Sequence, residues 1–485
     1  MLVHQVFHLL GDYIFVANIF LASVVIFFER KRPMYTLFWI TILLLTSYVG
    51  FIAYLFFGMK FYKKRNTEKF YTRNFLRQIY KDNHFKIQLV EKRTKLVTYI
   101  TETVGNKVTY LNNVYFFKEG NSFFNRMKED IRNAKESINM EYYIFNDDEF
   151  GNMIYDELIA KAREGVKIKI VIDGIGTKIL KKKRKKELEE AGIKLKTFFP
   201  SHFPFFRFGN LRANYRDHRK MCIIDSLILY TGGFNIGKEY IGKGKLGNWR
   251  DTGARISGEI AVDAEREFYI LWNFVHQGVN LKDVDKHLRK KINDIAEYKE
   301  KFHINAMQIV SSGPNYQTRT IRDSFINLIM SAKRSIYIET PYFVPDDLLL
   351  DCLRIAIRSG IEVKVIIPNI GDHLFVYWAN QAFVVELLEM GAEIYKYTDG
   401  FFHSKLIIID NEVASFGSSN FDYRSLYQNF EINFNVYDLE LVGHLREMFF
   451  QDVSKSNVLD YKVMKKRKAS EKIKEAVCRL ISPVI

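Results

Sequence analysis

The stretch "HSKLIIID" at residues 403–410 repeats the pattern of "HRKMCIID" at residues 218–225. In both, a lysine follows the histidine by two residues and an aspartate follows it by seven. Each stretch is followed by a glycine-led turn that ends in asparagine, "GGFN" at 232–235 and "GSSN" at 417–420. Because the same polar set occurs twice in one chain, the sequence indicates two copies of one domain.

The similarity between the copies extends beyond these motifs. "AKESINMEYYIF" (134–145) resembles "AKRSIYIETPYF" (332–343), and "GVKIKIVID" (165–173) matches "GIEVKVIIP" (360–368) in pattern. In each copy, continuous apolar strands alternate with helical patterns, which is typical of α/β layers with a buried sheet. A repeat of this length is a duplicated domain and not a solenoid unit. We therefore expect an α/β fold whose two duplicated domains are related by a pseudo-twofold axis.

The composition narrows the class of partner. The chain has 485 residues and a formal charge of +16, from 72 Lys and Arg against 56 Asp and Glu. This excess of positive charge favours anionic partners, either nucleic acid or an acidic membrane surface. The three cysteines, Cys222, Cys352 and Cys478, lie far apart with no C-x-x-C pair, which argues against a disulfide framework or a zinc site.

The N-terminal segment favours a membrane surface over nucleic acid as the partner. Residues 13–28 and 33–59 contain no charged side chain, and the second run is long enough to cross a ~30 Å hydrocarbon core. No Lys or Arg precedes Arg30, which argues against a cleaved signal peptide. We predict a two-helix membrane hairpin with "ERKR" at 29–32 as its turn, two buried soluble helices being the alternative. The more basic flank after the second run favours a cytoplasmic catalytic body.

The repeated motif can be interpreted as chemistry on one side of a strand. Side chains alternate along a strand, so His403 and Lys405 share one side, as do His218 and Lys220. Each strand therefore offers a nucleophile or proton-transfer group beside a fixed cation. Two such half-sites meeting at a pseudo-twofold axis would place one histidine on each side of a phosphorus atom.

The turns after the strands complete the predicted half-sites. Their small residues would let backbone N–H groups approach an oxyanion, and Asn235 and Asn420 would add side-chain donors. Together with the two lysines they would hold the non-bridging oxygens of a phosphoryl group. A lysine stands where a metal site would need a ligand, so we predict neither a metal nor another cofactor.

These motifs resemble those of the phospholipase D superfamily, and the wider match is to bacterial cardiolipin synthases over nearly the whole chain. The segments that carry the resemblance, besides the hairpin and the terminal "SPVI", are "EYYIF" (141–145), "NYRDHRKMCIID" (214–225), "GGFNIGKEYIG" (232–242), "WRDT" (249–252), "TPYFVPD" (340–346), "DHLFVYWA" (372–379), "FFHSK" (401–405) and "NFEIN" (429–433). The resemblance implies that the two domains are phospholipase D-like catalytic halves.

The resemblance also implies a reaction. Two phosphatidylglycerol molecules would give cardiolipin and glycerol through a phosphatidyl-histidine intermediate, with His218 as nucleophile and His403 as acid/base. Asp251 and Glu431 match the acids that orient each histidine in the family. Asp225 and Asp410 complete the catalytic motifs, and we expect them to brace the turns that present the asparagines.

The implied partners are phosphatidylglycerol and anionic membrane lipids, with no nucleic acid, for an integral, multi-pass protein of the cell membrane. The expected boundaries are a membrane hairpin over 1–60, a connector over 61–115, catalytic halves over 116–300 and 301–460, and a basic amphipathic helix over 461–485. The sequence leaves the oligomeric state open. It also leaves open a membrane-bound phospholipase D that hydrolyses phospholipids. A nuclease of the same superfamily is a further alternative, although two membrane spans argue against it.

Several other residues have two interpretations. Glu141 and Glu339 lie at matching positions and are either near the pocket or structural. His373 and Trp378 would line a lipid entrance, although Trp378 also suits the core. Near the C-terminus, Ile473, Ala476, Val477, Leu480 and Ile481 form one helical stripe, with basic residues beside it and "KKRK" (465–468) before it. The stripe either docks on the protein's own core or lies in the membrane interface.

Overall fold

The structure is a computed structural model that describes residues 13, 16–27, 33–54, 88–177, 180–199, 215–276, 279–316 and 318–482. Two compact units make up the chain, and the larger one, called the body below, covers Arg65–Pro200 and Arg216–Pro483. The predicted turn at 29–32 and residues 61–87 of the predicted connector lie outside the described residues.

The smaller unit contains a helix over residues 16–27 and helix α2 (Pro33–Ala53). Val25 packs with Trp39, Leu43 and Tyr54 in a small apolar cluster. Other apolar side chains of this unit are exposed, among them Phe20 at 67% and Leu45 at 78%. Within the described ranges, no helix combines the length and the apolar character that a membrane span requires.

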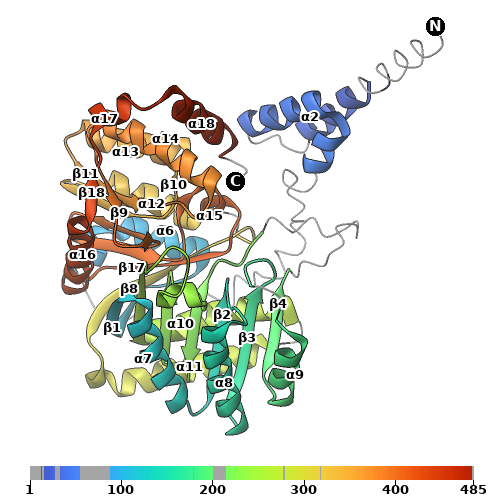
Figure 1. The fold of residues 1–485 in the computed structure, drawn as a ribbon. Helices are drawn as coiled ribbons and strands as arrows, with labels where there is room; N and C mark the ends of the chain where they lie inside the picture. The colour runs from blue at the N-terminus through green and yellow to red at the C-terminus, as the bar shows by residue number, and fades with distance from the viewer. Residues whose placement is uncertain are drawn as a thin grey trace. The chain divides into compact units, whose positions relative to one another are not determined.

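One large mixed sheet runs through the body (Figure 1). Its two central strands, β1 (Thr109–Glu119) and β8 (Ile304–Ser312), pair antiparallel with Thr109 opposite Met307. Outward from this centre, one half of the sheet has the order β1-β7-β6-β5-β2-β3-β4 and the other has β8-β17-β15-β14-β9-β11-β12. The two orders correspond strand for strand, so the α/β duplication expected from the sequence is confirmed, and its pseudo-twofold axis passes between β1 and β8.

The first half begins with β1, whose first residues fall within the segment predicted as connector. Its other elements are α7 (Gly120–Asn133), β2 (Ser137–Tyr142), α8 (Glu149–Arg163), β3 (Lys167–Asp173), α9 (Lys182–Glu190), β4 (Lys194–Phe198), β5 (Lys220–Ile224), β6 (Ile228–Gly232), η2 (Lys238–Ile241), β7 (Trp249–Gly258) and α10 (Glu259–His276). Helix α11 (Leu281–Glu297) and η3 (Lys299–Lys301) lead to the second half.

The second half repeats this order after β8. Its elements are α12 (Thr320–Met330), β9 (Ser335–Glu339), β10 (Phe343–Val344), α13 (Asp347–Arg358), β11 (Glu362–Pro368), α14 (Leu374–Met390), β12 (Glu393–Tyr397), β13 (Phe401–Phe402), β14 (Leu406–Ile409), β15 (Val413–Gly417), β16 (Phe421–Asp422), α15 (Tyr423–Tyr427), β17 (Glu431–Val436) and α16 (Leu439–Ser454). The chain ends with β18 (Ser456–Val458), α17 (Tyr461–Lys465) and α18 (Ala469–Ile481), while α5 (Gln88–Lys92) and α6 (Thr94–Val104) precede β1.

Helices cover both faces of the sheet and bury its continuous apolar strands (Figure 1). On one face, α10 and α16 share a single core with strands of both halves, for example Ile256 and Phe434. On the other face each half has its own core, under α7 and α8 in the first half and under α12, α13 and α14 in the second. The shared core fixes the two halves relative to each other, which is what a site built from both of them needs.

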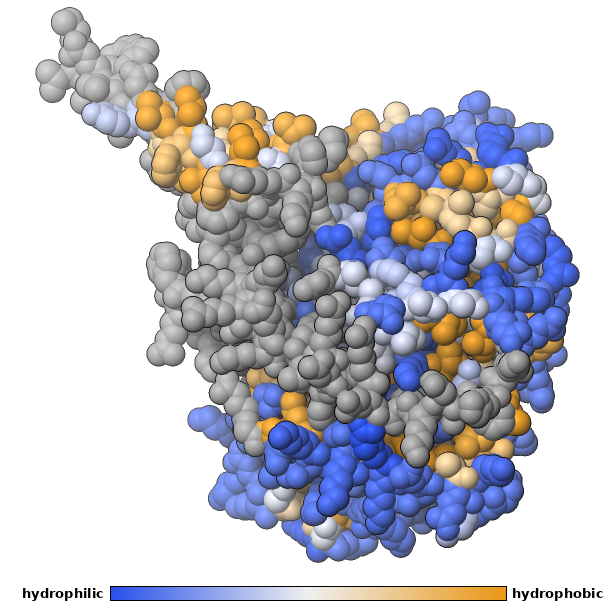
Figure 2. Space-filling model, turned by 180° about the vertical axis from the view of Figure 1, so that it is seen from behind, coloured by the Kyte–Doolittle hydropathy of each residue, from blue (hydrophilic) through white to orange (hydrophobic). Residues whose placement is uncertain are grey.

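The outer surface of the body, seen from behind, is mostly hydrophilic with a few apolar patches (Figure 2). Helix α9 is also hydrophilic: its charged residues pair along the helix, Lys183 with Glu187 and Lys186 with Glu190, and only Leu188 is buried. The three cysteines form no disulfide, as the sequence predicted, and all three are buried.

Candidate active site

His218 lies two residues before β5, and a carboxylate from the other half holds its imidazole. Its Nδ1 lies 3.0 Å from Oε1 and 3.1 Å from Oε2 of Glu431, the first residue of β17. The carbonyl oxygen of Ser418 lies 3.1 Å from the same nitrogen. Because Nδ1 is occupied in this way, Nε2 is the ring nitrogen left for chemistry.

His403 has the matching arrangement in front of β14. Its Nδ1 lies 2.6 Å from Oδ2 of Asp251, which belongs to β7 in the first half. The other carboxylate oxygen of Asp251 accepts a hydrogen bond of 2.8 Å from the backbone N–H of Thr252. Both orienting carboxylates are completely buried, so each is fixed in position.

Each histidine is thus oriented by a carboxylate that belongs to the other half. The backbone supports this exchange, because the N–H of His218 donates to the carbonyl of Phe430 at 2.9 Å and the N–H of His403 donates to that of Arg250 at 2.8 Å. Each histidine is therefore tied to the residue just before the carboxylate that orients it. Neither half contains a complete site.

The two motif lysines lie beside the histidines in equivalent positions. Nζ of Lys220 donates to the carbonyl oxygen of His218 at 2.6 Å, and Lys405 donates to that of His403. Burial lowers the pKa of Lys220 to about 7 and also lowers the pKa of Lys405, although Glu431 and Asp251 oppose the shift. A bound phosphate anion would offset this cost of burial, so the site favours an anionic ligand.

The pKa values of the two histidines are also lowered. Burial and Lys405 lower the pKa of His403 to about 4, against the opposing effect of Asp251. Burial also lowers the pKa of His218, with Glu431 acting against it. At neutral pH both rings are neutral, and an incoming phosphodiester would raise both pKa values by adding negative charge.

The small residues of the two turns have a different role from the one we expected. The N–H groups of Gly233 and Ser418 pair with the carbonyls of Thr252 and Ile432, so they do not approach an oxyanion. A Cβ atom on Gly233 would lie 1.9 Å from Oδ1 of Asp251. Glycine is therefore needed at 233 to let the carboxylate reach its histidine. The equivalent Ser418 instead donates from its hydroxyl to Glu431 at 2.5 Å.

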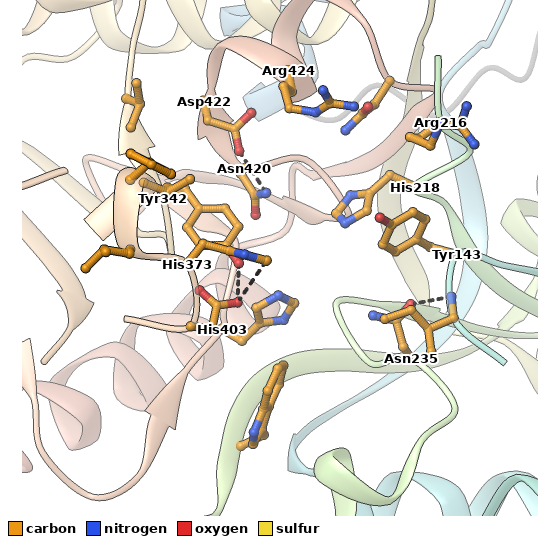
Figure 3. A pocket seen from close by; sticks show the side chains of 18 of the residues that line it. Tyr143, Arg216, His218, Asn235, Tyr342, His373, His403, Asn420, Asp422 and Arg424 are labelled. Carbon is orange, nitrogen blue, oxygen red and sulfur yellow. Dashed lines mark hydrogen bonds and ion pairs between the residues drawn. The ribbon is translucent and has the colours of Figure 1, made fainter. Parts of the chain in front are cut away.

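The two asparagines line the pocket, as Figure 3 shows. Asn235 accepts from the N–H of Ile144 at 3.2 Å and donates to the Tyr240 hydroxyl at 2.5 Å. Asn420 donates to Asp422 at 3.0 Å, and its buried Oδ1 has no partner within the described part of the chain. Both amides are therefore held at the pocket wall by neighbouring groups.

Asp225 and Asp410 anchor loops behind the site. Asp225 accepts from the N–H groups of residues 135–137 at 2.7–2.9 Å, and Asp410 accepts from those of residues 333–335 at 2.7–3.1 Å. These residues lead into β2 and β9, so the two carboxylates brace the strands next to the histidine strands. The expectation that they brace the asparagine turns was wrong, because those turns follow the next strands, β6 and β15.

Both histidines line one cavity of about 440 Å³ (Figure 3). Its aromatic wall includes Tyr143, whose ring lies 4.9 Å from that of His218, and Trp249, whose ring lies 5.2 Å from that of His403. Two arginines, the buried Arg216 and the half-buried Arg424, also line it, on the side of His218 away from His403. The cavity thus combines an aromatic wall with two arginines on one side. At the reacting centre, the two lysines stand beside two buried carboxylates.

Sequence reasoning missed these arginines and the aromatic wall. Arg216 and Arg424 lie two residues before His218 and four residues after Asn420, at positions that the other half does not repeat. It also missed Asp372, which accepts from the Tyr342 hydroxyl at 2.5 Å at the pocket edge. A comparison of the two halves cannot find residues that only one half carries.

The structure shows where the residues with two interpretations lie. Glu141 and Glu339 are buried away from the pocket, 3.7 Å from Nη1 of Arg219 and 3.8 Å from Nη2 of Arg250. Burial raises the pKa of both carboxyl groups, and that of Glu339 reaches about 8. Their role is structural. His373 lines the pocket, whereas Trp378 packs against the core of the second half.

Comparison with known proteins agrees with this geometry. The family described as "Cardiolipin synthase, PLD-like domain" matches residues 127–272 and 325–453, and "Phospholipase_D-nuclease N-terminal" matches residues 16–58. The larger match covers both half-sites. The smaller match lies within the predicted membrane hairpin.

Curated relatives match along almost the whole chain. "Major cardiolipin synthase ClsA" of Bacillus subtilis is 39% identical over 97% of this chain and 98% of its own, and "Cardiolipin synthase 1" of Staphylococcus epidermidis is 38% identical over 97% and 96%. A phosphatidylserine synthase structure from Haemophilus influenzae, 15% identical, shares the fold with a TM-score of 0.61 over 81% of this chain and 100% of its own. The chain therefore belongs to the phospholipase D-like cardiolipin synthase family.

Proposed function

We propose that this protein is a phosphatidyltransferase that converts two phosphatidylglycerol molecules into cardiolipin and glycerol. The observation that carries the proposal is the convergence of two histidines on one cavity, each with a buried carboxylate at Nδ1 and a lysine beside it. A double displacement at phosphorus needs a nucleophile and a separate acid/base group. The names of the curated relatives support the lipid substrate.

The reaction proceeds in two steps: the phosphatidyl group is transferred to His218 and then to the second lipid. Nε2 of His218 attacks phosphorus, the bond to the glycerol oxygen breaks, and His403 gives its proton to that oxygen. Neutral His403 then takes the proton of the primary hydroxyl of a second phosphatidylglycerol. The resulting oxygen attacks phosphorus, and the bond to His218 breaks. Lys220, Lys405 and the pocket asparagines stabilise the non-bridging oxygens.

The electrostatics of the cavity suit this sequence of steps. A neutral His218 can attack phosphorus. The negative charge of the arriving lipid stabilises the proton that the two rings must hold between them, and the reaction requires that proton on His403. Arg216 and Arg424 extend the positive charge of the pocket, which favours the entry of anionic head groups. We assign His218 as nucleophile and His403 as acid/base, following the order of the family motifs.

We further propose that residues 1–60 form a membrane hairpin, so that the protein is a multi-pass protein of the cell membrane with its catalytic body in the cytoplasm. The uncharged runs at 13–28 and 33–59 support the hairpin. So do the exposed apolar side chains of this unit, because lipid would cover them. The basic flank after the second run supports the cytoplasmic body.

Labelled phosphatidylglycerol, incubated with the purified protein in detergent and a metal chelator, tests the reaction. We expect cardiolipin and free glycerol in equal amounts, at the same rate with and without the chelator. Phosphatidic acid as the main product would instead indicate a hydrolase. Activity that depends on an added divalent metal would contradict the proposed mechanism.

Substitution of Asp251 by asparagine tests the exchanged carboxylates. The asparagine amide would favour the wrong tautomer of His403, so kcat/KM should fall by about 10²-fold or more. Asp251 raises the pKa of His403 against burial, so its loss lowers that pKa further. The basic limb of the kcat/KM profile, which reports loss of the imidazolium, should therefore move to lower pH.

The matched control is Asp399→Asn, which removes an exposed carboxylate paired with Lys455. It should leave both the rate and the pH profile unchanged. A slower Asp251→Asn enzyme with an unmoved basic limb would show that Asp251 acts only on the fold.

A further inference from the structure

Helix α18 exposes its apolar side and buries part of its polar side. Ile473, Val477 and Leu480 are 64%, 53% and 70% exposed, and their spacing places them on one side of the helix. Glu475 and Cys478 are the buried residues. An amphipathic helix of a soluble body normally buries its apolar stripe. The stripe predicted from the sequence therefore does not dock on the protein's own core.

Cys478 and Arg479 attach the helix to the body, and Glu475 binds the segment just before the helix. Glu475 accepts from Nε of Arg467 at 2.7 and 3.0 Å, and Arg479 pairs with Glu386 of α14 at 2.6 Å. Cys478 belongs to the core of the second half. These contacts orient α18 so that its apolar side faces outward as a fixed surface.

The surroundings of the stripe are positively charged. Residues 465–481 contain seven Lys and Arg against two Glu. Both glutamates have partners within the segment: Glu475 has Arg467, and Glu471 accepts from the N–H of Lys468 at 3.3 Å. Five lysines of the segment are exposed: Lys465, Lys466, Lys468, Lys472 and Lys474. An exposed apolar stripe between lysines complements an anionic bilayer surface, where acyl chains take the stripe and head groups take the charge.

Helix α14 connects this surface to the active-site pocket. Leu374 and Phe375, at the start of α14, line the pocket and are 69% and 57% exposed. Lys474 lies over the ring of Trp378, about one helical turn further along α14, at 5.1 Å from its centroid. The pocket edge and the N-terminal part of α18 are therefore held by adjacent turns of one helix.

We propose that α18 is an interfacial helix that inserts Ile473, Val477 and Leu480 into an anionic membrane surface and so holds the pocket edge at Leu374 and Phe375 against the lipid. Lipid head groups then reach the histidines from the bilayer without leaving it. The inference that α18 binds the membrane depends only on the surface of α18. The inference that this binding promotes turnover rests on the proposed lipid substrate.

Insertion is tested on the full-length protein in phosphatidylglycerol-containing proteoliposomes. Val477→Cys, labelled with an environment-sensitive fluorophore, should be quenched by lipids that carry a quencher on the acyl chain. Met153→Cys, on an exposed apolar position of α8 in the first half, is the matched control and should not be quenched. A label at 477 that stays unquenched overturns insertion, and a label buried instead in a dimer, shown by cross-linking, assigns the stripe to a second copy of the chain.

The effect on activity is tested with Val477→Glu/Leu480→Glu. Two buried charges would oppose insertion, so cardiolipin formation from bilayer phosphatidylglycerol should fall by about tenfold or more. Turnover of short-chain phosphatidylglycerol dissolved as monomers should be unchanged, and Met153→Glu should change neither rate. Equal losses on both substrates would overturn the proposal. A wild-type protein that forms no cardiolipin would refute the proposed reaction, while the quenching result would still decide the insertion.

Discussion

Alanine in place of His218 or His403 is expected to remove nearly all cardiolipin formation. Each variant loses a step that the remaining histidine cannot perform, because one ring must bond to phosphorus while the other moves a proton. The loss should reach at least the ~10²–10⁴-fold that a positioned proton-transfer group contributes. Initial rates with labelled phosphatidylglycerol in detergent measure it.

The matched control is His303→Ala, since His303 is exposed and lies outside the pocket. It should keep the rate of the wild type. Circular dichroism and gel filtration should show the same fold for all three variants. If His218→Ala or His403→Ala kept a near-normal rate, two cooperating half-sites would not be required for the reaction.

A second large effect is expected when the intermediate is trapped. An activated phosphodiester with a good leaving group needs little protonation, so His403→Ala should still form the phosphorus–nitrogen bond. The intermediate should then persist, because no base activates the acceptor. His403→Ala should accumulate a covalent adduct on His218, and His218→Ala should accumulate none.

Intact-protein and peptide mass spectrometry after an acid-free quench measures the adduct, because phospho-histidine is labile in acid. An adduct mapped to His403 in the His218→Ala variant would exchange the assigned roles and keep the two-step mechanism. Absence of an adduct in both variants would favour direct transfer between the two lipids.

Much of the fold could be predicted because local sequence patterns repeat in the two halves. The apolar strands, the turns and the two histidine motifs recur in the same order in both halves, and the sheet repeats that order. The histidine and lysine pairs could be placed side by side because side chains alternate along an extended chain. The histidines themselves lie before the strands, which begin at Lys220 and Leu406. The downstream acids, Asp251 and Glu431, could be named because they match the acids of the family that the motifs resemble.

What could not be predicted depends on contacts between distant segments. The spacing within one half gives no sign that Asp251 serves His403 in place of His218, since only the sheet brings β7 beside β13 and His403. Arg216 and Arg424 have no counterpart in the sequence of the other half, so no repeat points to them. The outward direction of the α18 stripe depends on Glu475 and Cys478, whose burial follows from docking on α14 and not from periodicity.

The exchange of carboxylates has a consequence for the origin of the chain. His218 reaching Glu431 and His403 reaching Asp251 is the reciprocal contact pattern of a symmetric dimer. A single half could complete its site only by pairing with a copy of itself, and then both acids would be identical. Joining the halves in one polypeptide released that constraint. One acid is now an aspartate packed against Gly233, and the other is a glutamate bonded to Ser418. The two sides of the site have thus been free to diverge while the reciprocal contacts kept the halves together.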